Sequence, residues 1–168
     1  MATTTPDNEH SARATGRSLP ISTKACVEIC RALRHKKTTA AKKLLEQVME
    51  KKKAIPFRRY NSGLSHKKEV GPGRFPFNSS REIFELIESA EANAQFKGLT
   101  TANLEITHIA AHQASRPFRF GRKRQRRAKR TTVEIVVSEQ KAQGNETKEG
   151  KMKEQKKTIQ VQEKEKHD

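Results

Sequence analysis

A run of fifteen residues, Arg116 to Arg130, carries nine cationic side chains and no acidic one. It lies between two segments with strand character, Leu104 to about Ala114 and Thr131 to Ser138. A stretch that holds nine of the seventeen excess positive charges cannot pack into a core, because its like charges repel one another. We therefore expect a long antiparallel hairpin. Its end, the basic finger (residues 116–130), should stand off the body and be neutralised by a polyanion.

Length and charge limit the classes of protein to which the chain can belong. A chain of 168 residues holds one domain plus tails. A net charge of +17 favours nucleic acid as the partner, with an acidic membrane surface as the weaker alternative. No apolar run approaches the roughly 20 residues of a membrane span, and the N-terminus lacks the apolar stretch of a secretory signal. The two cysteines fall on one short segment, so we expect a reducing, intracellular compartment and no disulfide framework.

Two segments in the first third of the chain carry apolar residues at helical spacing. The first follows Ser22, a good N-cap residue. The second opens at Thr38 or Thr39 and must end before Pro56, because the residue ahead of a proline avoids the α region. The apolar faces that this spacing predicts are Cys26, Ile29, Cys30 and Leu33 in the first helix and Ala41, Leu44, Leu45 and Val48 in the second.

A third helix has the clearest boundaries. Ser79 and Glu82 form a capping-box pattern, and Gly98 supplies the stop. Its predicted apolar face is Ile83, Leu86, Ile87, Ala90 and Ala94. With a short edge strand within Gly16 to Ser22, the elements predict an α+β fold: a small three-stranded antiparallel sheet packed with three helices, and a protruding basic β-hairpin.

Residues 55–77 have neither the helical nor the strand period and are rich in glycine and proline. A loop this long inside a compact domain is usually functional. Cations and aromatics alternate along it, as in segments that lie against RNA. We take its cations as candidate RNA contacts: Arg58, Arg59, Lys67, Lys68 and Arg74. The alternative is that Phe57 and Tyr60 are ordinary core residues and the arginines beside them are solvated.

In the basic finger, arginine outnumbers lysine by seven to two, and Phe118 and Phe120 interrupt the run. Arginine suits bidentate phosphate contacts and stacking on bases. The candidate RNA contacts here are Arg116, Arg119, Arg122, Lys123, Arg124, Arg126, Arg127, Lys129 and Arg130. A nuclear-localisation run and a solvated charge patch remain as alternatives.

The chain divides into three parts on composition. Residues 1–15 are expected to form a flexible N-terminal extension. Residues 16–139 are expected to form the RNA-binding domain, with its hairpin at about 104–138. Residues 140–168 are expected to form a disordered charged tail, since they have almost no apolar content.

Motifs for catalysis are absent from the sequence: it has no Gly-rich phosphate loop, no nucleophile motif and no His-Glu-x-x-His. The carboxylates from Glu82 to Glu91, every third residue, predict a solvated acidic face. Cys26-x-x-x-Cys30 and His108-x-x-x-His112 resemble metal-ligand pairs, but these cysteines lie on an apolar helix stripe and are better explained as packing residues. We expect no catalytic residue, no metal and no cofactor.

Five segments occur in an order that resembles a known family: KLLEQVMEKKKAIPFRRYNS (43–62), NAQFKGL (93–99), LEITHIAAHQA (104–114), Phe-Gly-Arg at 120–122, and VEIVVSE (133–139). The chain is similar to the large-subunit ribosomal protein family L-twenty-two, called L-seventeen in the eukaryotic naming, in its archaeal/eukaryotic form. The resemblance covers about Arg17 to Glu139. The finger is a few residues shorter than in eukaryotic relatives, Thr132 replaces a histidine of the family, and the tail has no counterpart.

The resemblance implies a structural constituent of the large ribosomal subunit that binds ribosomal RNA, supports assembly and lines the nascent-peptide exit tunnel with its hairpin. Implied partners are large-subunit RNA, neighbouring ribosomal proteins and the nascent peptide near the hairpin tip, with no membrane and no free homo-oligomer. The implied location is the cytoplasm, and the nucleolus during assembly if the chain is eukaryotic. The alternatives are a stand-alone RNA chaperone or translational regulator not stably bound to ribosomes, and a nuclease.

Overall fold

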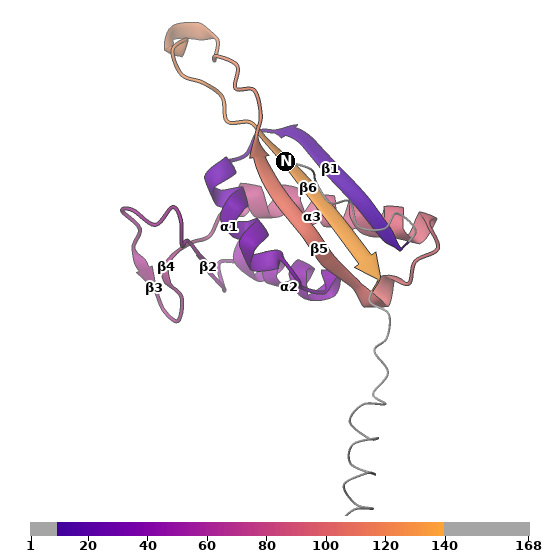
Figure 1. Cartoon of the computed structure of the whole chain (residues 1–168). Helices are drawn as coiled ribbons and strands as arrows, with labels where there is room; N and C mark the ends of the chain where they lie inside the picture. Colours follow the sequence, from indigo (N-terminus) through magenta and orange to yellow (C-terminus); the bar gives the residue numbers. More distant parts are fainter. Residues whose placement is uncertain (1–9, 140–168) are drawn as a thin grey trace, which may run out of the picture.

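The computed structural model describes residues 10–139, which form an α+β body with two protrusions (Figure 1). Residues 1–9 and 140–168 lie outside the described residues, and with them most of the expected N-terminal extension and the whole expected tail. Within the described range there are three α-helices and two antiparallel sheets of three strands each. The predicted α+β class and the three helices are confirmed. The second small sheet was not predicted.

The larger sheet contains β1 (Ser11–Leu19), β6 (Thr131–Glu139) and β5 (Leu104–Gln113) in the order β1-β6-β5. β6 lies in the centre and has a strict alternation, in which Val133, Ile135 and Val137 are fully buried and the residues between them are half-buried. It pairs with β5 from Leu104 opposite Glu139 to Gln113 opposite Thr131. The predicted hairpin strands are therefore confirmed, and the basic finger connects them.

The edge strand β1 is longer than expected, because it begins at Ser11 rather than near Gly16. Residues 11–15 therefore belong to the sheet and not to a flexible extension. The inward-facing residues Ala12 and Ala14 are small, and they are only 1% and 6% exposed. Alanine carries little strand preference, so this alternation does not stand out in the sequence.

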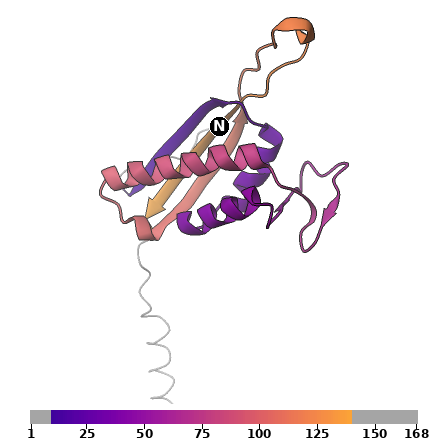
Figure 2. The same ribbon diagram turned by 180° about the vertical axis from the view of Figure 1, so that it is seen from behind.

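Helices α1 (Thr23–Leu33), α2 (Thr38–Met49) and α3 (Phe77–Phe96) cover one face of the larger sheet and leave the other face open (Figure 2). These helices and the larger sheet are called the body below. The predicted apolar faces form its core, except that Leu44 and Leu86 are only half-buried. The largest fully buried apolar side chains are Ile29, Leu33, Leu45, Val48, Ile55, Ile83, Ile87, Leu104, Ile106, Ile109 and Ile135.

The start of α3 differs from the prediction. The helix begins at Phe77 with Pro76 as its N-cap, and the Ser80 N–H donates to the Pro76 carbonyl at 2.9 Å. The expected capping box of Ser79 and Glu82 is therefore wrong, because Ser79 already lies in the first turn and is buried. A proline whose carbonyl accepts the first helical hydrogen bond can start a helix without a side-chain cap. The capping-box pattern does not detect a helix start of this kind.

The end of α3 agrees with the predicted stop at Gly98. Gly98 has a φ of +78°, its N–H donates to Gln95, and the Leu99 N–H donates to Ala94 at 3.0 Å. This pair of bonds is a Schellman motif, which requires a left-handed residue and therefore favours glycine.

The smaller sheet contains β2 (Ile55–Pro56), β4 (Gly71–Arg74) and β3 (His66–Lys67) in the order β2-β4-β3. It forms a side lobe (residues 55–74) that projects beside α1 (Figure 1). The expectation of a loop without either period thus missed three short strands, since strands of two to four residues are too short to show a period. Gly73 is required there, because a Cβ would lie 3.0 Å from the Ile55 carbonyl oxygen.

Candidate nucleic-acid interface

The basic finger continues the β5–β6 hairpin beyond the edge of the sheet. Backbone bonds across it join Ala114 N–H to the Arg130 carbonyl (3.1 Å), Ala128 N–H to Pro117 (2.9 Å), and Arg119 N–H to Arg126 (2.8 Å). A short 3₁₀ turn, η2 (Gly121–Lys123), closes the tip. In Figures 1 and 2 the finger extends away from the helices and the sheet, so almost all of its surface is available to a partner.

The cations of the finger differ from those of the body in their ion pairing. None of the finger side chains that the structure describes forms an ion pair with a carboxylate. The exposed ones are Arg116, Arg119, Arg122, Arg124, Arg126, Arg127 and Lys129. Arg130 at the base is half-buried and donates to the Ser18 carbonyl at 3.0 Å, so part of its role is to fasten the finger to β1. Lys123 lies in the turn at the tip.

Aromatic side chains stand among these cations. Phe118 is 57% exposed and Phe120 is 99% exposed. The guanidinium of Arg127 lies 4.9 Å from the centre of the Phe118 ring, so the two planar groups pack together. Exposed rings beside arginines are the arrangement on which unpaired bases stack.

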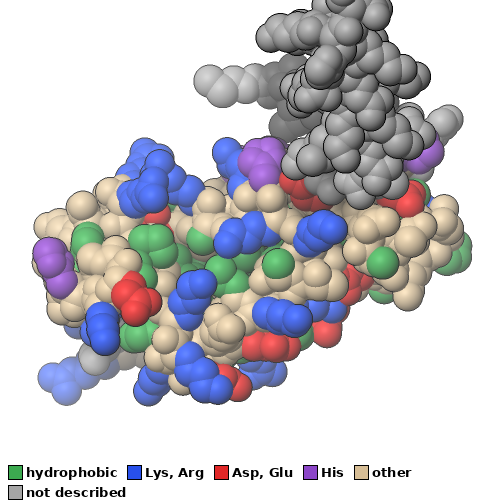
Figure 3. All heavy atoms as spheres, turned by 90° about the horizontal axis from the view of Figure 1, so that it is seen from below, with side chains coloured by type: hydrophobic (Ala, Val, Ile, Leu, Met, Phe, Trp, Pro, Cys, Tyr) green, Lys and Arg blue, Asp and Glu red, His purple; other side chains and the backbone are tan. Residues whose placement is uncertain are grey.

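The body distributes its charge differently. At the end of the body away from the finger, lysine and arginine side chains are spaced apart, with acidic and apolar side chains between them (Figure 3). On α3, Glu91 pairs with Lys42 of α2 at 2.6 Å and Glu85 pairs with Arg81 at 3.1 Å. The predicted acidic face thus exists and is partly neutralised by the body itself, whereas the finger is not.

The side lobe is fastened to α1 by a buried carboxylate that the sequence analysis missed. Glu28 is 1% exposed, and its Oε1 accepts the backbone N–H of Arg59 at 2.7 Å and of Tyr60 at 3.2 Å. Glu28 lies on the side of α1 opposite the apolar stripe, where a carboxylate is normally solvated. Only the folding of the lobe over this face buries it, so no local pattern could have identified it.

The candidate cations of the lobe differ in their exposure. Phe57 is only 4% exposed, so its ring is packed inside the protein, while Tyr60 is half-buried. Arg58, Arg59, Lys68 and Arg74 are exposed, as a phosphate-binding role requires. Lys67 is half-buried, with its ammonium 5.8 Å from the Phe75 ring.

The cysteines behave as core residues. Burial raises the pKa of Cys26 from 9.0 to about 11 and that of Cys30 to about 12, so both are protonated thiols at neutral pH. His108 and His112 are exposed on β5, on the open face of the sheet. Between residues 10 and 139, no three His, Cys, Asp or Glu side chains are grouped as a metal site.

No helix in the described range is long and apolar enough to cross a bilayer. The surface features are instead a basic finger and a basic lobe on a small α+β body, and no cationic side chain described in either one forms an ion pair. An arrangement of this kind is typical of structural proteins that bind polyanions.

Comparison with known proteins agrees with this class. The family model described as "Ribosomal protein L22p/L17e" matches residues 14–138. A "Large ribosomal subunit protein uL22" of Methanopyrus kandleri is 40% identical over 142 residues, which is 79% of this chain and 89% of that protein. Proteins of the same description from Archaeoglobus fulgidus and Methanoculleus marisnigri are 41% and 38% identical, covering 78% and 80% of this chain and 90% and 94% of their own lengths. The chain belongs to the ribosomal protein L22p/L17e family, whose role in the ribosome is structural.

Proposed function

We propose that this protein is a constituent of the large ribosomal subunit that binds ribosomal RNA through two basic surfaces, the finger and the side lobe. The relatives are named as large-subunit proteins, and this supports the location. The single observation that carries the RNA contact is the finger itself. It projects from the body with exposed cations that no described carboxylate neutralises.

The affinity comes mainly from the release of counterions from RNA phosphates. The proposed contacts are Arg58, Arg59, Lys67, Lys68 and Arg74 in the lobe, and Arg116, Arg119, Arg122, Lys123, Arg124, Arg126, Arg127, Lys129 and Arg130 in the finger. If about seven to nine phosphates are neutralised on duplex-like RNA, the logarithm of the binding constant should fall with the logarithm of the salt concentration with a slope of about −6 to −8. A slope near −2 would contradict contact along both surfaces.

We further propose that the finger lines the nascent-peptide exit tunnel, that the body contacts neighbouring large-subunit proteins, and that the protein supports subunit assembly. The slender hairpin supports the first point, since a finger reaching well beyond the body can pass between RNA helices (Figure 1). The protein then resides in cytoplasmic ribosomes, and in the nucleolus during assembly if the organism is eukaryotic.

Sedimentation in high salt tests the proposal. A stable constituent stays with large subunits when the monovalent salt is raised to the level that removes loosely bound factors. A stand-alone RNA chaperone or translational regulator is washed off under the same conditions. Cross-linking of the finger to a stalled nascent chain tests the tunnel position separately, and its absence from every stalled chain would exclude that position.

A further inference from the structure

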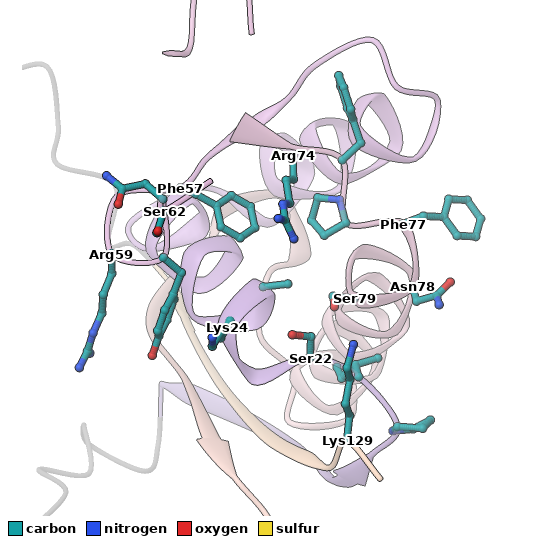
Figure 4. Close-up of a pocket in the computed structure, with 17 residues that line it drawn as sticks. Ser22, Lys24, Phe57, Arg59, Ser62, Arg74, Phe77, Asn78, Ser79 and Lys129 are labelled. Atoms are coloured by element: carbon teal, nitrogen blue, oxygen red, sulfur yellow. The ribbon is translucent and has the colours of Figure 1, made fainter. Parts of the chain in front are cut away.

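A cleft lies where the side lobe, the first turns of α1 and α3, and the base of the finger meet (Figure 4). Its volume is about 610 Å³, within the range of small-ligand sites. In Figure 4, Arg74 points into the cleft from the lobe and Lys129 points into it from the finger base, while Lys24 of α1 lies to one side with its ammonium over the Tyr60 ring. These three cations come from chain segments far apart in the sequence.

The lining of the cleft is electropositive. Arg59 at the rim brings the number of cations in the lining to four, and none of the lining residues is acidic. None of the four is ion-paired among the residues that the structure describes. Neither helix that opens on the cleft has an acidic residue in its first turn, so the positive ends of the helix dipoles are not neutralised locally. Like charges that line one cavity repel one another, and an anion bound among them removes this repulsion.

The rim of the cleft offers aromatic surface. Phe77, the first residue of α3, is 51% exposed and its ring projects from the rim in Figure 4. On the lobe side, the Tyr60 ring lies 5.6 Å from both the Lys24 ammonium and the Arg59 guanidinium. A cationic cavity with an exposed ring beside it matches a phosphate joined to a planar base.

We propose that this cleft binds one unpaired nucleotide of RNA. Its phosphate lies between Arg74, Lys24 and Lys129, and its base stacks on Phe77. The inference deepens the proposed function and rests on it, since it assigns a distinct chemical unit of RNA to one site. The finger and the exposed face of the lobe can bind duplex backbone of any sequence, whereas the cleft requires a nucleotide that is free of its helix.

An acidic peptide is the competing occupant, because carboxylates would also satisfy the cations. The exposed Phe77 ring favours the nucleotide, since a base offers a planar face to stack on it and a glutamate side chain does not.

The test uses the purified full chain with a fluorescent oligouridylate as the single-stranded probe and a short G·C-rich RNA duplex as the reference, both at one fixed salt concentration. Phe77→Leu keeps apolar bulk but removes the stacking face. We expect it to weaken oligouridylate binding at least about fivefold and duplex binding less than about twofold. The double variant Lys24→Gln/Arg74→Gln should weaken oligouridylate binding more than about tenfold. Its matched control, Lys43→Gln/Lys53→Gln, removes the same charge from exposed positions of the body outside the cleft.

The nucleotide site would be overturned if Phe77→Leu weakened the binding of oligouridylate and of the duplex equally. It would also be overturned if the two double variants weakened oligouridylate binding equally, or if the wild-type chain did not bind oligouridylate. Displacement of the probe by polyglutamate as readily as by unlabelled RNA would assign the cleft to an acidic peptide instead. Circular dichroism checks that each variant is folded. If the wild-type chain co-sediments with large subunits but the cleft variants bind oligouridylate normally, only the cleft proposal is refuted. If the cleft variants lose oligouridylate binding as expected but the wild-type chain does not co-sediment with large subunits, only the ribosomal role is refuted.

Discussion

The β5–β6 hairpin joins the body to the basic finger. The two regions are stabilised by different interactions. In the body, isoleucine, leucine and valine side chains from the helices and the larger sheet are buried together, and cations such as Lys42 have carboxylate partners. In the finger, no described side chain is fully buried, and the described cations have no acidic partner. Among the described side chains of the finger, Arg127 packs against the Phe118 ring.

The difference indicates how each region acquires its shape. Burial of apolar surface is available to the body in water, so the body can fold alone. The finger buries little and carries mutual repulsion, so we expect its hairpin to depend on the phosphates of a bound RNA. Five measurements test this difference between the body and the finger.

Hydrogen exchange of the free protein should show the largest difference. The amide of Ile135 in β6 should exchange only on global unfolding, whereas those of Arg119 and Ala128 open locally. We expect the finger amides to exchange at least about a thousandfold faster. Addition of large-subunit RNA should protect them. Slow exchange of Arg119 and Ala128 in the free protein would contradict the dependence of the finger on RNA.

A charge in the core should unfold the body. Ile87 is fully buried on α3, so Ile87→Asp places a carboxylate where no cation can reach it and should cost more than about 4 kcal/mol of unfolding free energy. Urea denaturation followed by circular dichroism measures the loss. The matched control is Ala92→Asp, on the exposed side of the same helix, which should cost less than about 1 kcal/mol. Similar losses in the two variants would refute the assignment of the core face.

Charge reversal in the finger should have the opposite effect. We expect Arg124→Glu/Arg127→Glu to leave the melting temperature of the free protein unchanged and to weaken RNA binding about a hundredfold or more, with impaired subunit assembly. Fluorescence titration and co-sedimentation measure the two binding effects. Lys43→Glu/Lys53→Glu carries the same change of charge on the body and should bind nearly normally. Loss of helicity in the finger variant would show that the folding of the body depends on the finger.

Removal of the carboxylate under the side lobe should loosen the lobe but not the body. In Glu28→Ala the backbone N–H groups of Arg59 and Tyr60 lose an acceptor that they share at a partly buried position, which costs about 1–3 kcal/mol. Their amides should then exchange about tenfold faster or more, and Glu28→Gln should restore part of the protection because its side-chain oxygen still accepts. Glu46→Ala, at an exposed glutamate of α2, is the control. Unchanged exchange at Arg59 and Tyr60 in Glu28→Ala would exclude this role of Glu28.

The smallest effect is expected at the ion pair that joins α2 to α3. The Lys42 ammonium lies 2.6 Å from a Glu91 oxygen, and the two side chains are 23% and 20% exposed. A double-mutant cycle of Lys42→Ala and Glu91→Ala should give a coupling of about 0.5–1 kcal/mol that decreases with added salt. A coupling that salt leaves unchanged would mean that packing of Lys42 over the Phe84 ring dominates.

Much of the fold could be predicted from local patterns. The three helices, the stop at Gly98 and the two hairpin strands follow from apolar spacing and from the conformational freedom of glycine. The start of α3, the full length of β1 and the short strands of the side lobe could not be predicted. The start of α3 depends on a proline cap, the length of β1 on two small alanines, and the lobe strands on segments of two to four residues. None of these features produces a periodic pattern of apolar residues in the sequence.

The candidate site divides in the same way. The basic finger and the cations of the lobe are visible in the sequence, because charge is a property of each residue and its concentration needs no partner within the chain. Glu28 and the cleft at the base of the finger are not visible, since they exist only where segments distant in the sequence meet. The positions of the positive charges and of the apolar faces follow from the order of the residues along the chain. The tertiary structure decided which carboxylate becomes buried and which cations share a cavity, because packing, and not neighbourhood along the chain, sets those distances.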